Sequence, residues 1–129
     1  MFAYSTTGLD PSELPAPLAK AVITAAFSSL FRQEVTMLLD SGADMTCVPT
    51  HIIAPFRKNL DYSEVQTQSF DGRGWIWKKT YLLCLDFVES DFTNLEVLET
   101  EDRIGLIGRD VLNQLKLILD GPKLSWSIE

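Results

Sequence analysis

The feature that most constrains this chain is an apolar run that ends in a carboxylate. Residues 35–39 read Val-Thr-Met-Leu-Leu and lead directly into Asp40, Ser41 and Gly42. The run predicts a buried strand whose end delivers an acidic side chain, and a buried carboxylate is costly unless it is paired or functional. Gly42 permits a tight turn that exposes Asp40 together with backbone N–H groups. We therefore expect this turn to carry chemistry.

Composition argues against several classes of protein. The 129 residues suit one domain, and a hydrophobic fraction of 46% is enough for its core. The net charge of −7 argues against nucleic-acid binding, because phosphate contacts need clustered Lys and Arg. No stretch approaches the ~18 apolar residues that cross a bilayer, and the N-terminus lacks the basic and apolar regions of a signal peptide. We expect a cytoplasmic protein with neither a membrane nor a nucleic-acid partner.

The residues that usually bind metals are few in this chain. Two cysteines, Cys47 and Cys84, and one histidine, His51, lack the close spacing of zinc ligands. We expect both cysteines to be reduced and buried, His51 to be exposed, and no metal or cofactor to be required.

The N-terminal third predicts an arm followed by two strands. Residues 1–17 contain three prolines and few large apolar residues, so we expect an extended arm before a domain at 18–129. Residues 18–31 combine helix-favouring Ala and Leu with a β-branched cluster, and their propensities are nearly even. We expect a strand that turns near Ser28–Gln33 into a second strand, Glu34–Leu39.

The rest of the chain predicts short strands and one late helix. A long hairpin is expected with arms Val65–Phe70 and Trp75–Phe87, and the glycines of its tip, Asp71–Gly74, supply positive φ angles and mobility. The remaining elements are predicted from short apolar runs and turn signals: a strand through Cys47 and Val48 stopped by Pro49, a loop or short helix at 50–63, a short strand containing Leu95, Val97 and Leu98, a strand at 104–108, a helix at Arg109–Leu115, and a terminal hairpin with arms Lys116–Asp120 and Lys123–Ile128. The predicted class is all-β.

The Asp40 turn has the residues for metal-free peptide hydrolysis. Such a reaction needs a base that activates water and an acid that protonates the leaving group, and two carboxylates that share one proton supply both. Ser41 adds a hydroxyl that can tie the loop to a partner. By itself the Asp-Ser-Gly triplet also fits a polar turn after a strand. The residues around it are therefore needed to choose between a catalytic turn and a structural one.

Two longer motifs follow one another along the chain. Residues 38–43 read Leu-Leu-Asp-Ser-Gly-Ala, with Asp44 and Thr46 next, and residues 106–112 read Leu-Ile-Gly-Arg-Asp-Val-Leu. Together they resemble the catalytic motif and the second signature of retropepsins, the aspartic peptidases of retroviruses, retrotransposons and related cellular proteins. The resemblance covers about residues 18–128. It implies a retropepsin-like acid protease barrel with one short C-terminal helix and one lobe per subunit.

The resemblance implies roles for the residues of the first motif. Asp40 would be the catalytic carboxylate, and each subunit of a homodimer would contribute one. Ser41 would hydrogen-bond across the dimer axis, while Gly42 and Ala43 would support the catalytic loop. Asp44 would contact the main chain of a substrate.

The resemblance also implies a substrate-binding surface. Asp44 would form an ion pair with Arg109, and the hairpin tip would act as a flap that closes over the substrate. The substrate-binding residues implied in this way are Asp44, Asp71, Gly72, Arg73, Gly74, Trp75 and Ile107. The pair Trp75 and Trp77 has two interpretations, one face of a half-buried strand or a wall of the substrate cleft.

These observations predict an aspartic endopeptidase that hydrolyses extended polypeptides with a water activated by two Asp40 carboxylates. Because the chain holds one Asp-Ser-Gly triplet and no internal repeat, the second carboxylate has to come from another copy. A homodimer and a polypeptide substrate are therefore the expected partners. Two other classes stay open: a catalytically silent dimerisation or peptide-binding module on the same fold, and an unrelated β-barrel that binds a small ligand.

Overall fold

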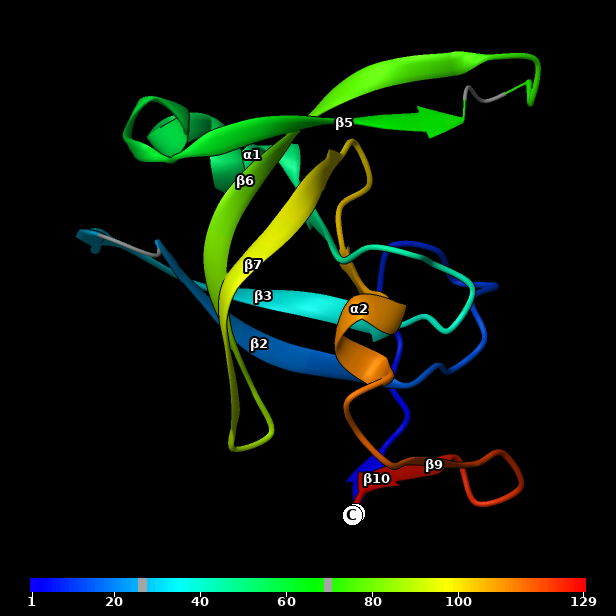
Figure 1. Cartoon of the computed structure of the whole chain (residues 1–129). Helices are drawn as coiled ribbons and strands as arrows, with labels where there is room; N and C mark the ends of the chain where they lie inside the picture. The colour runs from blue at the N-terminus through cyan, green and yellow to red at the C-terminus, as the bar shows by residue number, and fades with distance from the viewer. Residues whose placement is uncertain (26–27, 69–70) are drawn as a thin grey trace.

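The computed structural model describes residues 1–25, 28–68 and 71–129 (Figure 1). Their strands form two sheets, one of three strands in the order β1-β10-β9 and one of seven in the order β2-β3-β8-β4-β7-β6-β5. In chain order the elements are β1 (Phe2–Ala3), β2 (Leu18–Ala25), β3 (Ser28–Leu39), β4 (Cys47–Pro49), α1 (Thr50–Ile53), the 3-10 helix η1 (Ala54–Asn59), β5 (Tyr62–Gln68), β6 (Trp75–Phe87), β7 (Ser90–Thr100), β8 (Gly105–Ile107), α2 (Arg109–Leu112), β9 (Leu117–Asp120) and β10 (Ser125–Ile128).

The larger sheet closes on itself because β2 pairs with both β3 and β6. Strands of this sheet place alternate side chains inside, as a half-buried strand requires. The buried set includes Ala21 and Ile23 from β2, Val35 and Met37 from β3, and Leu83 from β6. The prediction of an all-β barrel with a short C-terminal helix is confirmed.

The predicted turn at Ser28–Gln33 is wrong, because these residues begin β3. Arg32 and Gln33 lie opposite Thr24 and Ile23 of β2. The polar residues resemble a turn in sequence, but a barrel strand turns alternate side chains outward, and Phe31 beside them is buried. Residues 26–27, which join the two strands, lie outside the described residues.

Several other boundaries also differ from the predictions. β5 starts at Tyr62 rather than Val65, and the predicted end of that arm, Phe70, lies outside the described residues. The short strand expected around Leu95–Leu98 is part of β7, which has 11 residues. The helix expected to reach Leu115 ends at Leu112, after which the N–H of Leu115 bonds to the carbonyl of Leu112 in a tighter turn. β7 is longer than expected because it pairs with β6 over most of its length, including its acidic and exposed residues.

The terminal sheet lies at the opposite end of the molecule from the β5–β6 hairpin (Figure 1). β9 and β10 form the predicted hairpin, and β1 adds to β10 with Phe2 opposite Trp126. The ring of Trp126 stacks on Phe2 at 4.4 Å and on Phe87 at 6.0 Å, which attaches this sheet to the barrel core. No helix in the described parts of the chain is long and apolar enough to cross a membrane.

Candidate active site

Strand β8 supports the turn that carries Asp40. This strand runs parallel to the end of β3, with Leu39 opposite Ile107. The backbone N–H of Asp40 donates to the carbonyl of Ile107 over 2.9 Å. The Asp40 backbone is thus fixed to the core while its side chain is half-buried. Ile107 is fully buried, which leaves its side chain no surface for the predicted substrate contact; its neighbour Leu106 is partly exposed.

The Asp40 carboxylate also organises its own turn. The N–H of Gly42 donates to Asp40 Oδ1 over 2.9 Å, and the N–H of Ala43 donates to the Asp40 carbonyl over 3.2 Å. Ser41 and Gly42 are exposed. A carboxylate has about four acceptor positions, so Asp40 keeps capacity for a water molecule or a second carboxyl group.

Gly108 lets the start of α2 approach the catalytic loop. A Cβ atom on Gly108 would lie 2.6 Å from the carbonyl carbon of Met45 and 3.0 Å from the carbonyl oxygen of Ala43. The N–H of Arg109 donates to the same Ala43 carbonyl over 2.9 Å. Because only glycine lacks a Cβ atom, no other residue permits this approach without a backbone shift.

Arg109 connects two points of the catalytic loop. Its Nη1 donates to the carbonyl of Ser41 over 2.8 Å, and its Nη2 pairs with the carboxylate of Asp44, so the predicted ion pair is present. The side chains of Arg109 and Asp44 are 43% and 83% exposed. Exposed pairs stabilise a fold by only about 0.2–1 kcal/mol, so in the single chain the main effect of this pair is on the position of Asp44.

Thr46 and Asp110 form a buried connection that the sequence interpretation missed. Thr46 is fully buried, and its hydroxyl donates to Asp110 Oδ1 over 2.8 Å while its N–H donates to Oδ2 over 3.0 Å. The same hydroxyl accepts the N–H of Gly108 over 3.2 Å, and Asp110 Oδ1 accepts the N–H of Val111 over 2.9 Å. The connection fixes the end of the catalytic loop to α2. Both residues belong to the two motifs, but their 64-residue separation hides the contact.

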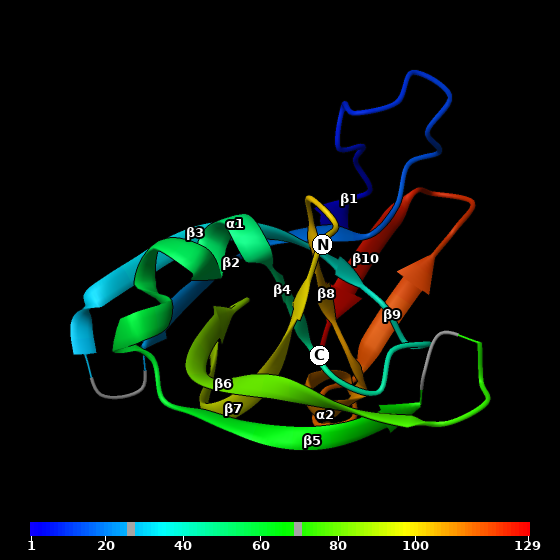
Figure 2. The ribbon, with the colours of Figure 1, turned by 90° about the horizontal axis from the view of Figure 1, so that it is seen from above.

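The predicted flap tip is an exposed turn. The N–H of Arg73 donates to Asp71 Oδ1 over 3.0 Å, and the side-chain amide of Gln68 donates to the Gly72 carbonyl over 3.2 Å. Gly72 has a φ of 73°, whereas Gly74 has no positive φ, so only one of the two predicted positive φ angles is present. Figures 1 and 2 show that β5 and β6 run side by side and project above the loop that follows β3.

Trp75 and Trp77 are not half-buried, as one interpretation predicted: they are 67% and 65% exposed. The register places Trp75 beside Gln68, and Trp77 beside Gln66, on one face of the hairpin. Ile76 lies on the other face, which also carries the partly buried Val65 and Thr67. Ile76, which was not predicted as a site residue, therefore lies on the less exposed face of the hairpin. Trp75 lies on the more exposed face.

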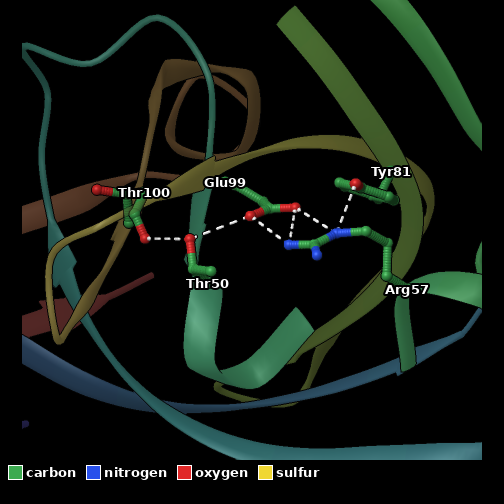
Figure 3. Close-up of polar contacts among 5 residues, drawn as sticks. All are labelled: Thr50, Arg57, Tyr81, Glu99 and Thr100. Atoms are coloured by element: carbon green, nitrogen blue, oxygen red, sulfur yellow. Dashed lines mark hydrogen bonds and ion pairs between the residues drawn. The ribbon is translucent and has the colours of Figure 1, made fainter. Parts of the chain in front are cut away.

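A second polar network lies at the base of the hairpin (Figure 3). Arg57 of η1 donates to both oxygens of Glu99 over 2.9 Å and from Nε to the Tyr81 hydroxyl over 3.2 Å. The hydroxyl of Thr50 shares its single proton between Glu99, at 3.0 Å, and the Thr100 carbonyl, at 3.2 Å. The network joins α1 and η1 to β6 and β7. It was missed because Arg57 sits in a basic pair that is typical of a solvated loop.

These contacts change the ionisation of the network. Partial burial raises the pKa of Glu99, but hydrogen bonds from Arg57 and Thr50 outweigh it and hold the pKa below its ordinary value of 4.5. The same bond to Glu99 raises the pKa of Arg57, and burial raises the pKa of Tyr81. At neutral pH the pair is therefore fully charged.

The described residues hold no group of three or more His, Cys, Asp and Glu side chains that could bind a metal ion. Cys47 and Cys84 are free thiols, partly rather than fully buried. His51 is exposed on α1, as predicted.

A family model described as retroviral aspartyl protease matches residues 15–120. The chain belongs to the retroviral aspartyl protease family. This membership confirms the resemblance drawn from the two motifs. A comparison with curated protein sequences gave no match.

Two solved structures of viral proteases share the fold of this chain. The EIAV protease, solved with an inhibitor, has a TM-score of 0.56 and 19% identity, and the match covers 89% of this chain and 100% of that one. The foamy viral protease–reverse transcriptase, solved with an RNA/DNA hybrid, has a TM-score of 0.52 and 17% identity, and the match covers 78% of this chain and 12% of that one. At these identities the likeness shows that the barrel is a retropepsin fold.

Proposed function

We propose that this chain is an aspartic endopeptidase that acts as a homodimer. The observation that carries the proposal is the Asp40 turn, whose backbone is fixed by Ile107 while its carboxylate stays accessible. Membership of the retroviral aspartyl protease family supports the same reading of the turn. One chain supplies one such turn, so a twofold-related copy supplies the second carboxylate.

In the proposed dimer the two Asp40 side chains share one proton. Like charges roughly 3 Å apart repel each other, so one carboxyl group holds the shared proton while the other is the carboxylate. The ionised Asp40 removes a proton from water as the water attacks the peptide carbonyl, and the protonated Asp40 gives its proton to the leaving nitrogen. The expected pH dependence of activity is bell-shaped. Ser41 would then bond to the other subunit beneath the pair.

The proposed substrate is an extended polypeptide that adds as a strand beneath the β5–β6 hairpin. The sheltered face of the hairpin carries Ile76, Thr67 and Val65, which favours apolar side chains near the cleaved bond. Asp44, held by Arg109, is available to the substrate main chain. We also propose that the reaction needs no metal, membrane or nucleic acid, and that it takes place in the cytoplasm.

The test is cleavage of a peptide library by the wild type and by Asp40→Asn. Loss of the acid–base pair should lower turnover by at least about 100-fold, while circular dichroism shows an unchanged fold. A folded Asp40→Asn variant that keeps its turnover would falsify the assignment. A wild type that binds peptides without cleaving them would instead identify a silent module on the same fold. Full inhibition by EDTA would contradict the metal-free mechanism.

A further inference from the structure

One face of the larger sheet connects the catalytic loop to the hairpin. A row of paired residues crosses four of its strands: Leu106 of β8, Cys47 of β4, Leu98 of β7 and Thr80 of β6. Directly paired residues point to the same face of a sheet. Leu106 and Cys47 are partly exposed, whereas Ile107 and Val48, which follow them in the chain, are fully buried. The row therefore lies on the face that points away from the barrel core.

Alternation along the strands extends this face at both ends. Leu38 of β3 pairs with Leu106, and Asp40 follows Leu38 by two residues, so both lie on the same side as the row. Lys78 precedes Thr80 by two residues on β6 and also lies on this side, which is the less exposed face of the hairpin. The face that begins at the Asp40 turn therefore ends at Lys78.

The charge of Lys78 reaches the middle of this face. Burial and the negative charge of Asp110 raise the pKa of the Cys47 thiol, and the positive charge of Lys78 acts in the opposite direction. Solvent and salt screen such effects steeply with distance, so the ammonium of Lys78 extends from the hairpin toward β4. Cys47 pairs with Leu106, directly beside the Asp40 turn.

Lys78 is a cation without a carboxylate partner. Arg57, at the base of the hairpin, and Arg109, at the catalytic loop, each pair with a carboxylate. Lys79 points to the opposite face of the hairpin, where its ammonium lies 4.7 Å from the centre of an aromatic ring. In the parts of the chain that the structure describes, Lys78 forms no ion pair. Its ammonium is therefore available to a carboxylate of a ligand.

We propose that Lys78 makes this enzyme select substrates that carry an acidic side chain at a fixed position beside the cleaved bond. The proposal rests on the peptidase of the proposed function and names its substrate class. A peptide strand beneath the hairpin turns alternate side chains toward it. The side chain nearest to Ile76 would be apolar, and the one nearest to Lys78, farther from the hairpin tip, would be Asp or Glu.

The charge of the rest of the chain restricts this preference to one position. The net charge is −7, and Asp40, Asp102 and Asp110 all act on Cys47 with the same negative sign. An acidic side chain of the substrate is therefore repelled elsewhere along this face. In a twofold dimer Lys78 occurs once on each side of the cleaved bond, so the preference is expected at one position on either side.

The test compares peptides that differ by one charge. A library keeps an apolar pair at the cleaved bond and places Glu, Gln or Lys at each outer position in turn. We expect the wild type to cleave the Glu peptide about fivefold better than the Gln peptide, by kcat/KM, at one outer position, the upper range for an ion pair open to solvent. The difference should shrink at high salt.

Two substitutions of Lys78 and one matched control assign the preference. Lys78→Met should make the rates of the Glu and Gln peptides equal, and Lys78→Glu should make the Lys peptide the better substrate. Lys79→Met is the control, because Lys79 is the next residue of β6 and points to the opposite face. It should keep the preference of the wild type for the Glu peptide.

The outcomes separate the selectivity from the activity. Equal rates for Glu and Gln peptides at every position of a cleaving wild type overturn the role of Lys78 and leave the peptidase standing. Equal loss of the preference in Lys78→Met and Lys79→Met also overturns it. If nothing is cleaved, the peptidase is wrong, and fluorescence anisotropy with the same labelled peptides decides the role of Lys78. Tighter binding of the Glu peptide by the wild type than by Lys78→Met supports that role, and equal or undetectable binding overturns it.

Discussion

Two glycine-containing loops of the proposed active site are held in different ways. The Asp40 loop is bonded to the buried interior, through the Ile107 carbonyl at its start and through Thr46 and Asp110 at its end. The hairpin tip is exposed, and the hydrogen bonds of Arg73 and Gln68 described above stay within the hairpin. The hairpin is anchored elsewhere, at its base, where Arg57 and Glu99 meet.

The difference follows from what each loop has to do. A reacting carboxylate loses efficiency when it is misplaced by about 1 Å, so many buried bonds are an advantage for the Asp40 loop. A cover over a substrate has to open and close, so local bonds and exposure are an advantage for the tip. The comparison predicts that substitutions at the buried supports of the first loop affect stability, whereas substitutions in the second loop affect turnover.

The largest effect is expected where α2 packs against the Asp40 loop. Gly108→Ala places a methyl group 2.6 Å from the Met45 carbonyl carbon, and backbone atoms cannot move aside as a flexible side chain can. We expect the free energy of unfolding to fall by about 3 kcal/mol, the upper end of the usual cost of overpacking, because the contacted atoms belong to the backbone. Urea denaturation measures it. Gly121→Ala is the control, because a Cβ at Gly121 meets nothing within 4 Å; equal midpoints for the two variants would refute the role of this contact.

A smaller loss is expected at the buried end of the same loop. Thr46→Val keeps the shape but removes the hydroxyl that bonds to Asp110 and accepts the N–H of Gly108. Leaving buried polar groups unpaired should lower the free energy of unfolding by about 1–3 kcal/mol. The control is Thr93→Val at an exposed position of β7, which should change stability little. If both valine variants unfold alike, the Thr46–Asp110 connection is not what fixes the loop.

At the hairpin tip the two glycines should respond differently. Gly72 has a φ of 73°, and Gly74 has open space and no positive φ. Valine at Gly72 is strained by roughly 1–2 kcal/mol, and the exposed tip would change its shape to relieve that strain. We expect turnover to fall about tenfold in Gly72→Val, with little change in melting temperature. Gly74→Val serves as the matched comparison; wild-type turnover in both variants would show that the tip does not take part in closure.

The contrast between the two loops also explains what could be predicted from sequence. The Asp40 turn was predictable because a buried strand, a carboxylate and a glycine are consecutive in the chain. Its supports were only partly predictable: the Asp44–Arg109 pair followed from the resemblance, but the Thr46–Asp110 contact joins residues that only the barrel brings together. Ile107 was misjudged because an apolar residue beside a site fits either the core or the cleft.

The same reasoning accounts for the misjudged strands. Arg32 and Gln33 were predicted as a turn because local polarity outweighed the pairing with β2 that holds them extended. One of the two interpretations of Trp75 and Trp77 placed them on one face of a half-buried strand, because large aromatic side chains are usually well buried. Their exposure depends on how far the hairpin projects from the barrel, and the periodicity of the sequence does not predict that distance.

The smallest effect is expected at the anchor of the hairpin. The pKa of Glu99 is held below its ordinary value of 4.5, so the folded state stabilises the ionised form of Glu99 more than the protonated form. The resulting stability is fully present above that ordinary value and is lost as the pH falls through the pKa of the folded state.

Glu99→Gln should therefore lower the free energy of unfolding by about 0.5–1 kcal/mol at pH 7, since the Arg57 side chain is partly exposed and solvent weakens the pair. At a pH below the folded pKa of Glu99 the difference between variant and wild type should disappear. Thermal unfolding at the two pH values measures this. Glu34→Gln is the control, because Glu34 faces Lys20 at 3.8 Å with both side chains largely exposed, and it should behave as wild type throughout. If the Glu99→Gln difference is the same at both pH values, the anchor depends on the shape of the side chain, and its charge does not hold the base of the hairpin.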